Sequence, residues 1–224
     1  MDALIQNFFN VEIMRAALPF LLKGLGMTAV LCVVVVPLGL AGGLGVALLG
    51  SARRGWIGWP VIVYVDFFRA FPPLVLLIFI YFGLPFLRIN VPAFVAVALA
   101  FLLNTSSYYG EIFRAGIESV GSGQSEAARS TGLTRAQTLA YVVVPQAVRN
   151  VLPDLIGNTL EVVKLTSLGS VVALPELLYA ARSAQSITYN PSPIVLAAAM
   201  YFVLLWPGVR VLSRLERRML VSRR

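Results

Sequence analysis

The stretch GLGMTAVLCVVVVPLGLAGGLGVALLGSA, residues 24–52, contains no charged side chain in 29 consecutive positions. A helix needs about 20 apolar residues to cross the ~30 Å of hydrocarbon in a bilayer. Because hydrocarbon offers the backbone no hydrogen-bond partners, a crossing segment must satisfy its own amides and carbonyls, as a helix does. The stretch therefore predicts a membrane-spanning helix. Its glycines predict close packing on a neighbouring helix, with a hinge as the alternative.

Similar apolar segments recur along the chain. Uncharged runs cover residues 70–87, 89–110 and 183–209, the last with a polar first part, and a mixed apolar stretch lies between residues 149 and 182. We predict five spans, at about 20–49, 59–86, 91–116, 148–172 and 194–214, in an all-α integral membrane domain of residues 20–218. Residues 1–19 are predicted to form a separate amphipathic segment that lies on the bilayer surface.

The composition excludes several classes of protein. Of the 224 residues, 58% are apolar and 12% are charged, whereas soluble domains carry about 25% charge. An ordinary soluble enzyme and a disordered chain are therefore excluded. The one cysteine, Cys32, rules out a disulfide scaffold, and the absence of histidine rules out His-based catalysis and His-ligated metals. With no clustered carboxylate site either, a membrane enzyme is disfavoured.

The basic residues predict the orientation in the membrane. Twelve of them fall on the side reached after the first, third and fifth spans, against four on the other side. The rule that positive loops stay inside therefore places the N-terminus outside and the C-terminus in the cytoplasm. The same rule explains the net charge of +8 without any nucleic-acid partner. The twelve are Arg53, Arg54, Arg114, Arg129, Arg135, Arg149, Arg210, Arg214, Arg217, Arg218, Arg223 and Arg224.

One substantial cytoplasmic segment is predicted, at about residues 119–147. A short helix-forming piece that includes Glu126, Ala127 and Ala128 is followed by Gly132, which accepts the left-handed turn that ends a helix. Thr134 and Gln137 have the spacing of a capping box and predict the start of a second helix. The two short helices form a compact knob, and an ordinary connecting loop is the alternative.

These residues carry a resemblance to a known family. Glu126-Ala127-Ala128, then Gly132, then Pro145-Gln146-Ala147 resembles the EAA loop of ATP-binding-cassette importer permeases. The runs Glu111 to Ile117 and Lys164 to Leu168 are similar to the polar amino-acid permease subfamily, and the resemblance covers about residues 18–218.

The resemblance implies a fold, an activity and partners. The expected fold is that of methionine-importer permeases, with five transmembrane helices and a cytoplasmic coupling helix. The expected activity is ATP-driven amino-acid import across a bacterial inner membrane. Glu126, Ala127, Ala128 and Gly132 would couple the chain to a separate ATPase subunit that binds ATP and Mg²⁺. Other implied partners are a second permease subunit, identical or similar, and an extracytoplasmic substrate-binding protein. This chain has no Gly-x-x-x-x-Gly-Lys-Ser/Thr motif and is expected to hold no cofactor itself.

Charged residues inside the predicted spans form acid–base pairs. Asp66 and Arg69, Glu111 and Arg114, and Glu161 and Lys164 are each three residues apart, which places both members on one helix face. Mutual neutralisation is one explanation, because a charge in lipid costs at least ~2.5 kcal/mol. The other is a polar substrate cavity, to which Thr166 and Ser167 could add hydroxyls. On this second hypothesis Glu161 favours a cationic or zwitterionic substrate.

Three alternatives to amino-acid import remain open from the sequence. The chain could be a passive channel, a structural membrane subunit, or a permease for an amino-acid-like compound such as an opine or a compatible solute.

Overall fold

The computed structural model describes residues 6–51 and 55–222, and all regular elements in these ranges are helices. Four helical segments are long and apolar enough to cross a membrane, namely Gln6–Gly50, Ala93–Glu118, Leu152–Val172 and Ser192–Arg217, and a bent pair makes a fifth. The predicted all-α architecture with five spans is confirmed. Of the basic residues used to predict the orientation, Arg53, Arg54, Arg223 and Arg224 lie outside the described residues.

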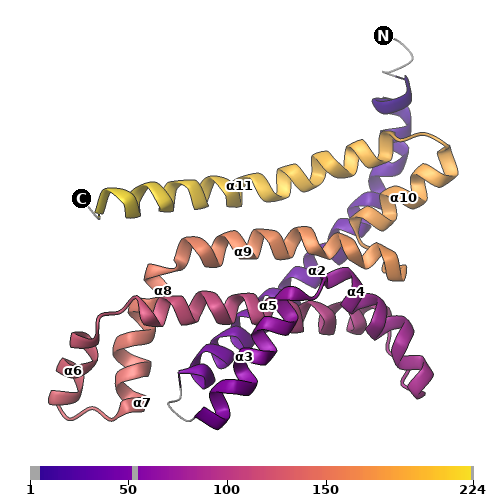
Figure 1. Cartoon of the computed structure of the whole chain (residues 1–224). Helices are drawn as coiled ribbons and strands as arrows, with labels where there is room; N and C mark the ends of the chain where they lie inside the picture. The colour runs from indigo at the N-terminus through magenta and orange to yellow at the C-terminus, as the bar shows by residue number, and fades with distance from the viewer. Residues whose placement is uncertain (1–5, 52–54, 223–224) are drawn as a thin grey trace.

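The long helix α2 (Val11–Gly50) crosses α5 (Ala93–Glu118), and these two make the most extensive helix contact in the described chain (Figure 1). Small residues allow this approach. A Cβ at Gly43 would lie 2.8 Å from the Gly110 nitrogen, and one at Gly42 would lie 3.0 Å from the Ser106 Cβ. α2 is unbroken through these positions, and Gly42 and Gly43 make the predicted close packing on α5.

The helix that contains the first span begins before the predicted boundary at residue 20. The structure makes residues 11–50 one helix, and Asn10 caps it by accepting a hydrogen bond from the Ile13 nitrogen at 3.1 Å. Beyond the cap, the Asn10 nitrogen donates to Ser192 Oγ at 3.0 Å, and Asn190 Nδ2 donates to the Gln6 carbonyl at 3.0 Å. These bonds join the start of the first helix to the turn before the last one. Residues 1–5 of the predicted N-terminal segment lie outside the described residues.

The second span, predicted as one helix over 59–86, is bent. Helical segments Gly58–Ala70 and Pro73–Leu87 meet at 99°. The first belongs to α3 (Gly55–Ala70), and the second comprises α4 (Pro73–Ile78), η1 (Phe79–Gly83) and η2 (Leu84–Leu87). Pro72 and Pro73 explain the break, because proline has no N–H to donate and disfavours helical geometry in the residue before it.

The last third of the chain holds a helix that the sequence analysis missed. After α9 (Leu152–Leu165) and η4 (Thr166–Val172), the chain forms α10 (Leu177–Thr188), which packs on α2 and on α11 (Ser192–Ser222). The fourth span begins at Leu152 and not at 148, because α8 (Val144–Asn150) ends first. The helix of the fifth span, α11, continues past the predicted end at residue 214.

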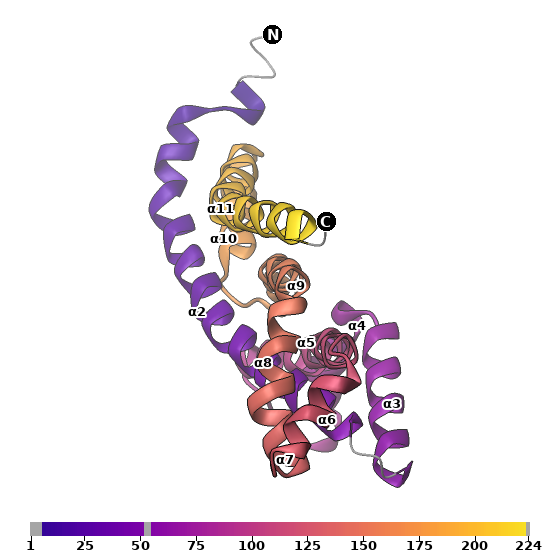
Figure 2. The same ribbon diagram turned by 90° about the vertical axis from the view of Figure 1, so that its left-hand side faces the viewer.

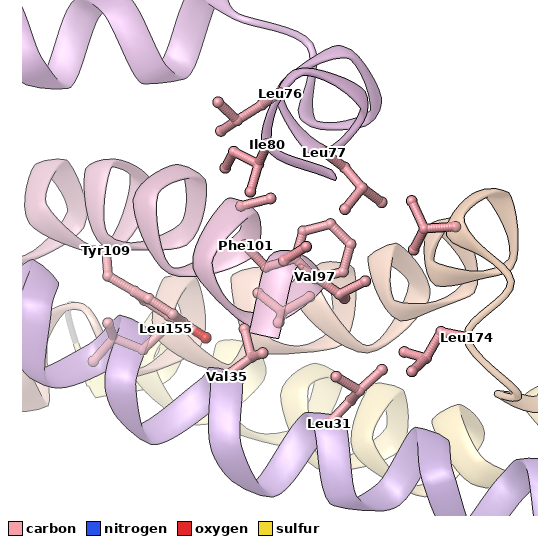
Figure 3. Packing of buried hydrophobic residues seen from close by; sticks show 14 of the residues in the cluster. Leu31, Val35, Leu76, Leu77, Ile80, Val97, Phe101, Tyr109, Leu155 and Leu174 are labelled. Carbon is pink, nitrogen blue, oxygen red and sulfur yellow. The ribbon is translucent and has the colours of Figure 1, made fainter. Parts of the chain in front are cut away.

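The main core lies where α2, α5, α4 and α9 meet (Figure 3). Leu31 and Val35 of α2 point toward Val97 and Phe101 of α5, while Leu77 closes the cluster from α4. Tyr109 is buried too, and its hydroxyl shares a 2.8 Å hydrogen bond with Thr159 Oγ1 of α9. The core thereby fixes α5 and α9 relative to each other, and the polar residues described below lie on these two helices.

Glu176 fixes α10 from a fully buried position. Its carboxylate accepts hydrogen bonds from the Leu178 and Tyr179 nitrogens, at 2.8 and 2.7 Å, and from the Tyr201 hydroxyl at 2.9 Å. Gly24 makes room for this turn, since a Cβ there would lie 2.9 Å from the Glu176 carbonyl oxygen. Burial raises the pKa of the Glu176 carboxyl above its ordinary value.

Candidate functional site

The predicted coupling loop folds as two short helices that project from one end of the bundle (Figure 2). α6 (Ser122–Ser130) carries the EAA residues, and α7 (Arg135–Thr138) follows. Gly132 between them has φ +92°, the left-handed conformation expected of it. Thr134 and Gln137 form the predicted capping box, in which the Thr134 nitrogen donates to Gln137 Oε1 at 2.9 Å.

The loop is held firmly against the end of α5. A Cβ at Gly116 would lie 3.0 Å from the Ala147 carbonyl oxygen, so α5 and α8 touch through their backbones. Nearby, Asn150 Nδ2 donates to Ser119 Oγ at 2.8 Å. The end of the predicted coupling loop is therefore in direct contact with α5.

The two sides of α6 differ. One side lines a cavity of about 750 Å³ between the loop and the ends of α2 and α5, and Glu126 and Arg129 lie on this side. Ala127 is exposed on another side, while Ala128 is buried. In the part of the chain that the structure describes, Glu126 forms no ion pair. The exposed side of α6 is the surface available to a partner.

The predicted acid–base pairs are formed in two cases out of three. Arg114 Nη2 lies 2.6 Å from Glu111 Oε1, and Lys164 Nζ donates to Glu161 Oε1. Arg69 does not pair with Asp66, because its guanidinium turns toward α5 and lies 3.9 Å from Glu111 Oε1. Glu111, Arg114 and Arg69 thus form one charge cluster that spans two helices.

A second cavity, of about 230 Å³, lies between α5, α9 and the bend of the second span. Of the predicted pathway residues, only Glu161 lines it. The two predicted hydroxyls bond within their own helix: Thr166 Oγ1 donates to the Val163 carbonyl at 2.6 Å and Ser167 Oγ to the Lys164 carbonyl at 2.7 Å. The remaining lining residues are Pro73, Asn104, Thr105, Tyr108, Asn158, Val162 and Leu165.

Two lining groups have no hydrogen-bond partner. Thr105 Oγ1 and Asn158 Nδ2 are buried and unpaired, while the neighbouring Asn104 Nδ2 donates to the Phe68 carbonyl at 3.0 Å. An unpaired buried polar group costs about 1–3 kcal/mol, and the Thr105 hydroxyl faces α2, where a Cβ at Gly39 would overlap it. The sequence analysis missed these residues. The sequence contained one signal for them, the helical spacing of polar residues. Asn104 and Tyr108 are four residues apart, and Asn158 and Glu161 are three residues apart, so each pair lies on one helix face.

Comparison with known proteins decides the family. The model of a family described as binding-protein-dependent transport system inner membrane components matches residues 35–221. The chain belongs to this family. The permease is 36% identical to a probable amino-acid ABC transporter permease protein of Bacillus subtilis, over 79% of this chain and 78% of the relative. The predicted ATP-binding-cassette permease subunit in a multi-pass membrane architecture is thereby confirmed.

Solved structures agree with the fold. The permease matches a chain in the crystal structure of an amino acid ABC transporter at a TM-score of 0.83 and 38% identity, over 92% of this chain and 96% of that one. A chain of the MetNI methionine ABC transporter matches at a TM-score of 0.70 and 21% identity, over 88% and 96%. The predicted methionine-importer-like fold of the permease is confirmed.

Proposed function

We propose that this permease forms the translocation pathway of an ATP-driven importer for amino acids, with a preference for substrates that carry a cationic group. The observation that carries the substrate class is the cavity between α5 and α9, which the acidic Glu161 lines together with the polar residues Asn104, Thr105, Tyr108 and Asn158. The similarity to amino-acid transporters supports the same class.

In the cavity, each group has a distinct task. Glu161 accepts hydrogen bonds from the substrate's ammonium or cationic side chain, exchanging its contact with Lys164 for the substrate. The substrate carboxylate faces the donors on the α5 wall of the cavity, Asn104 Nδ2 and the Tyr108 hydroxyl. Arg69, Glu111 and Arg114 act outside the cavity, in electrostatic positioning of α3 against α5, and Asp66 also lies outside the cavity.

The energy for transport comes from a partner. The exposed side of α6, with Ala127 at its centre, docks on an ATPase subunit that binds ATP and Mg²⁺, while the buried Ala128 attaches the helix to the bundle. Glu126 lies on the cavity side of α6 and forms no ion pair among the described residues, so it is available to a partner's arginine that enters this cavity. Gly132 sets the turn that presents the helix. A second permease subunit completes the pathway, and a binding protein delivers substrate to the outer face.

The proposed orientation follows from the charges. The coupling loop and the C-terminal end of α11 lie at the same end of the bundle (Figure 1), and that end carries most of the arginines. We assign it to the cytoplasm.

Uptake into proteoliposomes tests the function. The permease is reconstituted with its ATPase and binding protein, and labelled amino acids compete with a panel that includes an opine and a compatible solute. We expect ATP-dependent uptake, with Glu161→Gln raising the KM of cationic amino acids about tenfold or more because a charge-assisted contact is lost. Asp154→Asn, on the same helix but outside the cavity, is the matched control.

Three results would contradict the proposal. Flux without ATP would indicate a channel. Competition only by the opine or the compatible solute would assign a different substrate. An unchanged substrate ranking in Glu161→Gln would remove Glu161 from the recognition site.

A further inference from the structure

Two adjacent prolines at the bend of the second span remove the helical partners of two carbonyl groups. In an α-helix the carbonyl of residue i accepts from the nitrogen of residue i+4. The carbonyl of Phe67 still does so, from the Phe71 nitrogen at 2.9 Å. The next two, at Phe68 and Arg69, would need N–H groups from Pro72 and Pro73, which have none.

Two side chains of α5 supply the missing donors. Asn104 Nδ2 donates to the Phe68 carbonyl at 3.0 Å, and the Tyr108 hydroxyl donates to the Arg69 carbonyl at 3.2 Å. The donors are four residues apart on one face of α5, so they match two consecutive carbonyls of α3. The Tyr108 ring also lies 5.6 Å from the Arg69 guanidinium carbon. Since unpaired carbonyls are costly inside a membrane, these bonds hold the bend in place.

The same two side chains line the candidate substrate cavity, together with Pro73 from the bend itself. On the opposite wall are Asn158 and Glu161 of α9. A substrate in this cavity therefore lies within reach of the donors that fix the bend.

We propose that Asn104 and Tyr108 are positioning residues that link occupation of the cavity to the geometry of the bend. A substrate carboxylate competes with the two backbone carbonyls for these donors, and a charged acceptor forms the stronger hydrogen bond. When the donors turn to the substrate, the carbonyls of Phe68 and Arg69 lose their partners, so α3 and α4 rearrange to satisfy them. The geometry of the bend between α3 and α4 therefore depends on whether substrate occupies the cavity. This inference rests on the proposed amino-acid function.

Tyr108→Phe isolates the effect, because it removes the hydroxyl and keeps the ring. Spin labels at the exposed positions Val63 in α3 and Phe79 in η1 report the distance across the bend, in a background with Cys32→Ala. The reconstituted transporter is measured without substrate and with saturating arginine. Tyr64→Phe is the matched control, since its hydroxyl also joins α3 to α5, through Ser106 Oγ at 2.7 Å, but reaches neither orphaned carbonyl.

We expect arginine to shift the distance distribution in the unaltered protein. Tyr108→Phe should broaden or shift the distribution without substrate and reduce the arginine-dependent change by about half or more, and substrate-independent ATP hydrolysis should rise. A Tyr108→Phe distribution identical to that of the parent protein, with and without arginine, would overturn the proposal. So would an equal effect of Tyr64→Phe. If the parent protein transports no amino acid, the proposed function is wrong. The substrate-free comparison of the parent protein with Tyr108→Phe still decides whether the Tyr108 hydrogen bond holds the bend.

Discussion

Gly43 of α2 packs so closely on Tyr109 of α5 that a Cβ at position 43 would overlap the Tyr109 Cβ. The neighbouring Gly45, on the same helix, has nothing within 4 Å of its would-be Cβ. The two glycines therefore play different parts, although they are two residues apart in the sequence.

Gly43→Ala should destabilise the permease by about 1–3 kcal/mol, because the helices must separate to admit the methyl group. Gly45→Ala should leave stability unchanged or raise it by up to about 1 kcal/mol through better helix propensity. Thermal unfolding of both variants in detergent measures the difference. Equal melting temperatures would show that the α2–α5 contact tolerates a wider spacing.

Gly132→Ala should weaken coupling, because φ +92° is strained for any residue with a side chain. We expect a loss of about 1–2 kcal/mol in the stability of the α6–α7 turn and less ATP hydrolysis stimulated by substrate. Gly123→Ala, inside α6 with open space around it, is the control and should retain full stimulation. Retained stimulation in Gly132→Ala would mean that the turn does not set the docking geometry.

Lys164→Met should improve recognition of cationic amino acids, because it frees Glu161 from its internal partner. Exposed ion pairs contribute up to about 1 kcal/mol, so we expect the KM to fall about two- to fivefold. Lys23→Met, which alters an exposed lysine of α2, is the matched control. A raised KM in Lys164→Met would instead make Lys164 a direct contact of the substrate.

The buried Glu176 predicts a pH dependence of stability. Burial raises its pKa in the folded state above the ordinary 4.5, so the folded protein holds this proton more tightly than the unfolded chain. Its contribution to stability is therefore fully present below pH 4.5 and is lost as pH rises through the raised pKa. Glu176→Gln should remove this slope. Unfolding free energies at several pH values measure it, and parallel curves for the two proteins would contradict the assignment.

The number of spans and the coupling loop were predictable because each depends on local signals. Uncharged length marks a span, and Gly132 with the Thr134–Gln137 box marks the turn and the helix that follows. The adjacent Pro72 and Pro73 were a signal for the bend, but the length of the uncharged run alone favoured one straight helix. A hydropathy pattern does not show whether the helix axis changes direction.

The cavity was harder to predict. Their charge led to the prediction that Glu111, Arg114 and Asp66 line a substrate cavity. Among the charged residues that the structure describes, only Glu161 lines the cavity between α5 and α9. Thr166 and Ser167 looked available, although their hydroxyls bond to their own helix. Which polar side chains remain unpaired depends on how α5 and α9 are rotated about their axes, and tertiary packing decides that. Similarly, α10 was missed because it is too short and too polar to give a span signal.

The hydrogen bond from the Asn10 nitrogen to Ser192 Oγ joins residues 182 positions apart. At a synthesis rate of about 5–20 residues per second, Ser192 leaves the ribosome roughly 10–40 s after Asn10. During that interval the first helix is already in the bilayer without its final neighbour. The contact between the start of α2 and the start of α11 therefore forms late in synthesis, only after Ser192 has emerged.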